Sequence, residues 1–142
     1  MPRKLSRILF AIAATAAITL GVQTAAQAQV IGDETYGSYV VQSTETGRCE
    51  AHIVLSQVDG NLDAYAWFLN DYAGWSCVGW LERSTDGGIH WYMVSGTHTV
   101  ASDRNNIHVD NTGYYYDGTT YFARACFHFT FSGAATHCTR AR

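Results

Sequence analysis

Short runs of alternating apolar and polar residues, separated by turn residues, make up the chain after residue 38. In residues 49–55, the apolar side chains of Cys49, Ala51, Ile53 and Leu55 recur with the two-residue period that places them on one face of a strand. Long stripes with the three- and four-residue spacing of an amphipathic helix do not occur there. The pattern therefore predicts an all-β domain.

Seven or eight strands fit this pattern. Residues 62–69 are apolar on both faces and predict a central strand that is covered on two sides, whereas 99–112 is polar and predicts mostly loop. The longest strand is expected at 120–131. The other predicted strands cover residues 39–43, 49–55, 76–83, 89–94, 107–109 and 134–139, with turns at 45–47, 59–61 and 84–88. This arrangement predicts a small β-sandwich, with a small β-barrel as the alternative.

The first 28 residues differ in composition from the rest. A basic start with Arg3, Lys4 and Arg7 precedes an Ala/Ile/Leu-rich run at 9–22, and Ala26-Gln27-Ala28 offers the small residues that a signal peptidase needs. The run is too short to span a bilayer comfortably. The sequence therefore predicts a signal peptide at 1–28 and one secreted, extracellular β domain at 29–142.

Charge limits the partners of this predicted domain. All twelve carboxylates lie in it, but only six of the nine basic residues do, so its formal charge is −6 and it contains no Lys. Nucleic-acid backbones and anionic membranes attract clustered Lys and Arg. We therefore expect neither nucleic-acid binding nor membrane insertion. The predicted partner is another secreted protein or protein complex, with a glycan as the other candidate.

The four cysteines Cys49, Cys77, Cys126 and Cys138 predict two disulfides, since their number is even and the predicted compartment is oxidising. Three connectivities are open. We favour Cys49–Cys77 with Cys126–Cys138 because both pairs close short segments. No C-x-x-C or paired Cys/His spacing of a metal site occurs, so the sequence predicts no metal and no cofactor.

Residues 84–91, "STDGGIHW", form a motif in which each residue type suits a turn. Asp86 can accept backbone N–H groups of its own loop, Ser84 can add a local bond, Gly88 can take a positive φ, and Trp91 can pack across the base. The motif resembles an Asp-box, the hairpin repeated in sialidase-like propellers and found singly in other secreted β proteins. In those families it stands away from the catalytic centre. One copy excludes a propeller, and the predicted role is that of a structural turn, with ligand or calcium contact through Asp86 as the alternative.

Aromatic residues are the candidate binding groups. Tyr114, Tyr115 and Tyr116 stand beside a turn, and strand alternation forces at least one of them outward. Together with Trp75 and Tyr72 they predict an exposed aromatic patch for protein or glycan contact. The other interpretation, in which these rings cover the ends of the sandwich, stays open.

Catalytic residues are not predicted. Histidines and glutamates could supply acid–base chemistry, but none stands in a spacing that implies a site. Glu50 and His52 share one face of a strand, and Glu82 and Arg83 lie on opposite faces of another. The candidates considered are His52, His90, His98, His108, His128, His137, Glu34, Glu45, Glu50 and Glu82.

The predicted function is that of a secreted, non-enzymatic protein-binding module, an adaptor or subunit of an extracellular complex. The four cysteines, the size, the Ala-rich signal and the all-β pattern resemble small secreted actinobacterial proteins. Among these are the adaptor subunits of umbrella-shaped toxin particles, which bridge a long repeat protein and a lectin- or protease-like subunit.

Two alternatives are kept. The first is an inhibitor of a secreted hydrolase, which would resemble the two-disulfide amylase and protease inhibitors of filamentous soil bacteria and would insert the loop at 102–113. The Trp-Arg-Tyr triplet of those amylase inhibitors is missing here. The second is a small ribonuclease or glycan hydrolase, because small secreted microbial ribonucleases contain Asp-box-like hairpins and pair a Glu with Arg and His.

Overall fold

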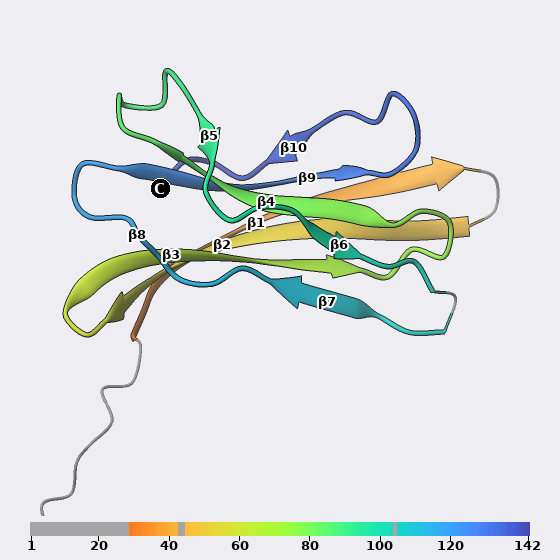
Figure 1. Cartoon of the computed structure of the whole chain (residues 1–142). Coiled ribbons are helices and arrows are strands. Elements are labelled where there is room, and N and C mark those ends of the chain that lie inside the picture. Colours follow the sequence, from red (N-terminus) through yellow and green to blue (C-terminus); the bar gives the residue numbers. More distant parts are fainter. Residues whose placement is uncertain (1–28, 43–44, 104) are drawn as a thin grey trace, which may run out of the picture.

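Two antiparallel sheets packed face to face form the computed structural model of this chain (Figure 1). The structure describes residues 29–42, 45–103 and 105–142, with side chains from residue 49 onward within those ranges. The predicted β-sandwich is confirmed, and in these residues the sheets do not close into a barrel. The predicted signal peptide lies outside the described residues. Within them, no helix is long and apolar enough to cross a membrane.

The first sheet contains five strands. Its order is β1 (Gln29–Gln42), β2 (Glu45–Val58), β3 (Asn61–Asn70) and β7 (His108–Asn111), and β8 (Tyr115–Tyr116) also pairs with β3. The turn expected at 59–61 is present, with positive φ at Asp59 and Gly60. The turn expected at 45–47 is wrong, because these residues already pair with β1.

The second sheet also contains five strands. Its order is β10 (His137–Cys138), β9 (Phe122–Phe129), β4 (Cys77–Ser84) and β5 (Tyr92–Met93), and β6 (His98–Val100) also pairs with β4. The hairpin expected around 84–88 forms, although its second strand has two residues only. The short strand expected at 107–109 is present as β7, shifted by one to two residues, whereas the end of β6 lies in the segment 99–112 where mostly loop was expected. The strand expected to be the longest, β9, has 8 residues against 14 in β2.

The core lies between the sheets, and β3 shows how the alternation builds it. Ala64, Ala66 and Phe68 are buried on its inner face. Tyr65 and Trp67 are half-buried on its outer face, so the expectation that both faces are covered is wrong. Tyr and Trp suit such a position because one part of each ring packs while its polar atom meets water.

One close approach sets the distance between the sheets near the middle of the core. The ring of Phe68 in β3 lies against Gly79 in β4, where an added Cβ would stand 2.4 Å from the ring. Phe68 is fully buried and can take this place only because Gly79 has no side chain.

Disulfides connect strands both between and within the sheets. Cys49 of β2 is bonded to Cys77 of β4 across the core, and Cys126 of β9 is bonded to Cys138 of β10 in the same sheet. These are the pairs that the sequence favours. A disulfide commonly adds about 2–4 kcal/mol to the stability of a small domain.

Candidate docking surface

The loop between β4 and β5 is closed by the side chains of Ser84 and Asp86. Asp86 Oδ1 accepts hydrogen bonds from the backbone N–H groups of Ile89 at 3.1 Å and His90 at 2.9 Å. Ser84 Oγ donates to Asp86 Oδ1 at 2.7 Å and accepts from the N–H of Gly88 at 2.9 Å. The His90 N–H, the Ser84 hydroxyl and the His90 imidazole hold the pKa of Asp86 well below its usual range. The carboxylate is therefore ionised and used within its own loop.

A chain of side-chain contacts fixes the same loop to the outer face of the second sheet. Trp91 Nε1 donates to the Gly88 carbonyl at 2.9 Å, and the Arg124 guanidinium lies 4.1 Å from the centre of the Trp91 ring. Arg124 Nη2 stands 2.7 Å from Glu82 Oε2, and Trp80 Nε1 donates to Glu82 Oε1 at 2.8 Å. Both oxygens of Glu82 and the face of Trp91 are thus engaged, and the loop is held at a defined angle.

Ser84, Asp86 and His90 do not have the geometry of a nucleophilic triad. In such a triad the imidazole lies between the hydroxyl and the carboxylate. Here the carboxylate lies in the middle, because Asp86 Oδ2 is 2.6 Å from His90 Nδ1 while Ser84 Oγ is bonded to Asp86 Oδ1. Ser84 is also fully buried. The arrangement closes a loop and does not activate the hydroxyl.

Arg83 joins the two sheets at the same end of the sandwich. Its Nη2 donates to the backbone carbonyl of Tyr116 in β8, and its guanidinium carbon lies 5.0 Å from the centre of the Tyr121 ring. The rings of Tyr116 and Tyr121 meet edge to face at 6.2 Å. Tyr92 of β5 stands opposite Arg83 in the ladder. Arg83, Tyr92, Tyr116 and Tyr121 are called the arginine–tyrosine cluster below.

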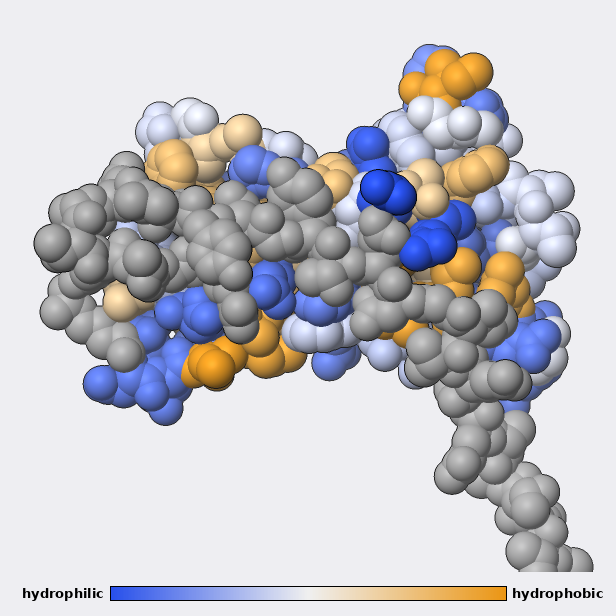
Figure 2. All heavy atoms as spheres, turned by 180° about the vertical axis from the view of Figure 1, so that it is seen from behind, coloured by the Kyte–Doolittle hydropathy of each residue, from blue (hydrophilic) through white to orange (hydrophobic). Residues whose placement is uncertain are grey.

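Most of the large hydrophobic side chains that are exposed in the described part of the chain lie at this end. The six found there are Ile89, Tyr92, Met93, Tyr114, Tyr116 and Phe122, and the three found elsewhere are Trp75, Ile107 and Val109. Ile89, on the projecting β4–β5 loop, is the most exposed of the nine at 74%. This loop ends in a hydrophobic cap at the upper right of Figure 2. The concentration marks this end as a candidate docking surface.

The tyrosine run divides between surface and core as strand alternation requires. Tyr114 and Tyr116 are exposed at 53% and 54%, and Tyr114 contacts the Tyr65 ring edge to face at 4.9 Å. Tyr115 is turned toward the inner face and packs against the core. Tyr115 is therefore not part of an exposed patch, whereas Tyr114 and Tyr116 are exposed.

Tyr72 and Trp75 do not join the tyrosine run in one patch, which corrects the expectation. Tyr72 is buried, because its N–H donates to Asn70 Oδ1 at 2.9 Å and its ring packs inward. Asn70 Nδ2 also donates to the Trp75 carbonyl at 2.9 Å. Asn70 ends β3, whereas Tyr116 pairs with Asp63 near its start, so the two groups lie at opposite ends of that strand.

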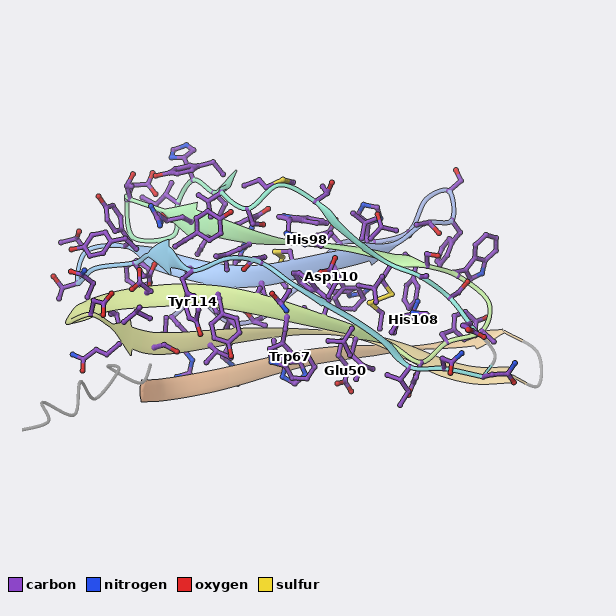
Figure 3. The ribbon with its side chains drawn as sticks, turned by 60° about the horizontal axis from the view of Figure 1, so that its bottom comes forward. Glu50, Trp67, His98, His108, Asp110 and Tyr114 are labelled. Atoms are coloured by element: carbon purple, nitrogen blue, oxygen red, sulfur yellow. A yellow bond between two sulfur atoms is a disulfide. The ribbon has the colours of Figure 1, made fainter. Side chains whose placement is uncertain are left out.

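Apart from His90–Asp86 in the β4–β5 loop, the histidine–carboxylate pairs of the described residues lie on other surfaces of the sandwich. His52 is buried and stacks on Trp67 at 3.6 Å, so it is not on a solvated face. Figure 3 shows Trp67 on the first sheet, with Asp110 and His98 where the edges of the two sheets meet. The pairs are Glu50–His52 at 3.2 Å, His98–Asp110 at 3.3 Å and His108–Asp103 at 3.5 Å. They therefore do not form one site with the arginine–tyrosine cluster.

A buried carboxyl group lies beside the cluster. Asp117, which follows Tyr116, is 1% exposed, and its Oδ1 has no hydrogen-bond partner among the described residues. Burial raises the pKa of Asp117 to about 6, while the charge of Arg83 lowers it and that of Asp63 raises it further. The charge of Asp117 therefore changes near pH 6.

A group of possible metal ligands does not fit a metal. The ligand atoms of Glu82, Cys126 and Cys138 lie within 4.8 Å of one another, but both sulfurs belong to one disulfide. Zinc is bound by thiolates, which these sulfurs are not.

Comparisons with protein-family models, with curated proteins and with solved structures found no match for this chain. The resemblance of residues 84–91 to an Asp-box therefore stays a prediction from the motif. Sequence reasoning missed Arg83, Tyr121, Ile89 and Asp117 as parts of this surface. The isoleucine in a polar turn motif was the available signal, because turn positions favour small polar residues.

Proposed function

We propose that this protein is a secreted binding module that docks on another secreted protein, as an adaptor or subunit of an extracellular complex. The observation that supports the proposal is the concentration of exposed aromatic and aliphatic side chains at the end of the sandwich where Arg83 contacts Tyr116 and Tyr121. Tyr, Trp and Arg are the residues most enriched among those that dominate binding energy in protein interfaces.

The rigidity of this surface also favours binding. Ile89 is held by a hydrogen bond from its N–H to Asp86, and Tyr116 is held through its carbonyl by Arg83. A loop whose backbone is ordered before association loses less conformational entropy when a partner arrives. An exposed Ile adds little to folding, so its place on a fixed loop is better explained by contact with a partner.

Affinity purification of the tagged secreted protein from its native medium tests the proposal. We expect a stoichiometric partner with the unchanged protein and with Ile107→Ala, a matched control that is 61% exposed away from the surface. Ile89→Ala and Tyr116→Ala should weaken binding of the identified partner by about 30-fold or more, the effect of losing a hot-spot contact of about 2 kcal/mol. The melting temperature of Ile89→Ala should stay unchanged because that side chain is largely exposed, whereas that of Tyr116→Ala should fall slightly because its ring also packs on Tyr121 and on the turn at Gly118.

Two results would contradict the proposal. One is a protein that purifies alone and monomeric, and the other is a partner whose affinity is equally insensitive to all three substitutions. A bound glycan in place of a protein would move the function to the second partner class.

An inhibitor of a secreted hydrolase is the second candidate, and the β4–β5 loop favours it. A projecting, hydrogen-bonded loop with one apolar side chain exposed suits insertion into an enzyme cleft. The loop first expected to do this, 102–113, is less suitable because residues 108–111 pair with β3. Purification of a single hydrolase that loses activity on adding the protein, but not on adding Ile89→Ala, would support inhibition over an adaptor role.

An enzyme such as a ribonuclease or glycan hydrolase remains the third candidate. Glu82 and Arg124 provide a carboxylate beside a guanidinium, but each is engaged by tryptophan as well as by the other. RNA or glycan cleavage that is lost in Glu82→Gln, with unchanged folding, would favour this class.

A further inference from the structure

We propose that Asp117 is a proton-controlled latch for the arginine–tyrosine cluster, in which the ionised carboxylate draws Arg83 away from Tyr116. This inference names a regulation of the proposed docking surface. The latch itself is a property of the isolated domain, so it can be tested without a partner.

The backbone around Asp117 is fixed to the first sheet. The N–H groups of Asp117 and Gly118 both donate to the Leu62 carbonyl, at 2.8 and 3.3 Å. Gly118 has a φ of 54°, and an added Cβ there would lie 3.1 Å from the Tyr116 hydroxyl. The turn is therefore tightly packed, and the Asp117 side chain cannot reach water unless the turn opens.

The surroundings of the Asp117 side chain favour its neutral, protonated form. Asp117 is 1% exposed, and its Oδ1 accepts no hydrogen bond from the described residues. A charged carboxylate in such a place would lose its hydration without full compensation. A neutral carboxyl group tolerates the same place at much lower cost.

Two charged groups act on Asp117 from the strands around it. Arg83 of β4 is bonded to the carbonyl of Tyr116, the residue before Asp117, and its charge favours the ionised carboxylate, whereas the charge of Asp63 in β3 opposes it. Asp63 stands opposite Tyr116 in the β3–β8 ladder, so it is fixed at the cluster. When Asp117 loses its proton, Arg83 is the cation that can compensate the new charge.

Two sets of contacts then compete for the Arg83 guanidinium. In the described arrangement it donates to the Tyr116 carbonyl and covers the Tyr121 ring. A carboxylate is a stronger acceptor for a guanidinium than a neutral carbonyl is. Ionisation of Asp117 therefore favours movement of Arg83 toward the carboxylate, which releases Tyr116 and uncovers Tyr121. The arginine–tyrosine cluster is therefore ordered in mild acid and less ordered at higher pH.

NMR of the isolated secreted domain tests the latch, with labelled Asp carboxyl groups and Tyr rings followed from about pH 4 to about pH 8, a range that includes ordinary histidine titration. We expect the Asp117 carboxyl and the rings of Tyr116 and Tyr121 to change with one midpoint at about pH 6. Asp117→Asn should keep both rings at their acid positions throughout. Asp63→Asn should retain the step but move its midpoint to lower pH, because the charge of Asp63 raises the pKa of Asp117.

Arg83→Gln provides a second, independent variant. Its loss of positive charge should move the Asp117 midpoint to higher pH and abolish the ring step, since no guanidinium remains to change partners. The latch is refuted by an Asp117 midpoint in the ordinary aspartate range, by rings that do not move, or by a ring step that persists in Asp117→Asn. If the domain shows the latch but binds no partner, the proposed function is refuted and the latch is not.

Discussion

Replacing Asp117 with Asn should make the stability of the domain less dependent on pH. The pKa of Asp117 is about 6 in the folded protein, against an ordinary value of 3.8 in an unfolded chain. Between these values the folded protein binds more protons than the unfolded one, so its stability falls as the pH rises. The contribution is fully present below about pH 3.8 and is lost as the pH passes through about 6.

The size of the effect follows from the separation of these two pKa values. A shift of one unit corresponds to about 1.4 kcal/mol, so about two units correspond to at most about 3 kcal/mol between mild acid and neutral pH. Movement of Arg83 toward the carboxylate, or entry of water, reduces this figure because either would stabilise the charged form. In a domain of this size, about 1 kcal/mol shifts the melting temperature by about 4–8 °C.

Denaturant unfolding followed by tryptophan fluorescence measures this directly, at several pH values between about 4 and about 8, with the unchanged protein and Asp117→Asn side by side. We expect similar free energies of unfolding in mild acid and a more stable Asn variant at the alkaline end, because Asn stays neutral. Asp63→Asn removes one negative charge but keeps the Asp117 carboxyl, so its stability should still fall as the pH rises, with the fall beginning at lower pH. A difference between protein and variant that is flat with pH, or one that favours the unchanged protein as the pH rises, would refute the reasoning.

Two further substitutions test the loop and the core. Asp86→Ala removes the acceptor of two backbone N–H groups, so it should lower the melting temperature at neutral pH. The loss should shrink below the ordinary aspartate pKa, because a carboxylate with a lowered pKa stabilises the fold only while ionised; a loss independent of pH would contradict this. Gly79→Ala places a Cβ 2.4 Å from the buried Phe68 ring and should cost about 1–3 kcal/mol in urea unfolding, whereas Gly113→Ala, which meets no atom within 4 Å, should cost less. Equal stability of the two would show that Phe68 does not depend on Gly79.

Features that depend on neighbouring residues could be predicted from the sequence. The alternation in β3 sets which residues face the core, and the contacts of Asp86 lie within four residues of it. Residues 45–47 were misassigned because the turn signal is local, whereas a long neighbouring strand, β1, decides that they are extended. Local chemistry thus predicts a turn well and a strand boundary poorly.

The candidate surface needed contacts between distant residues, which spacing does not reveal. Arg83 and Tyr116 are 33 residues apart, and they meet only because β4 and β8 end at the same side of the sandwich. By residue type alone Tyr72 and Trp75 suit an exposed patch equally, but Trp75 is exposed at the other end of β3 and Tyr72 is buried. Asn70 decides otherwise, since its side chain draws the Tyr72 backbone inward. Residue type therefore predicts that a binding surface contains exposed aromatic side chains, but it does not predict which aromatic residues those are.

The closed loop at 84–91 connects the folding role of its motif with the proposed binding role. Asp86, at the centre of the loop's hydrogen bonds, is satisfied locally, so it need not contact a partner. Ile89 contributes its N–H to that network while its side chain stays in solvent. The backbone of one residue thus serves the fold while its side chain is left free for contact. All the hydrogen bonds of a motif can therefore serve to close its loop, and the closed loop still determines the position of a residue that docks on a partner.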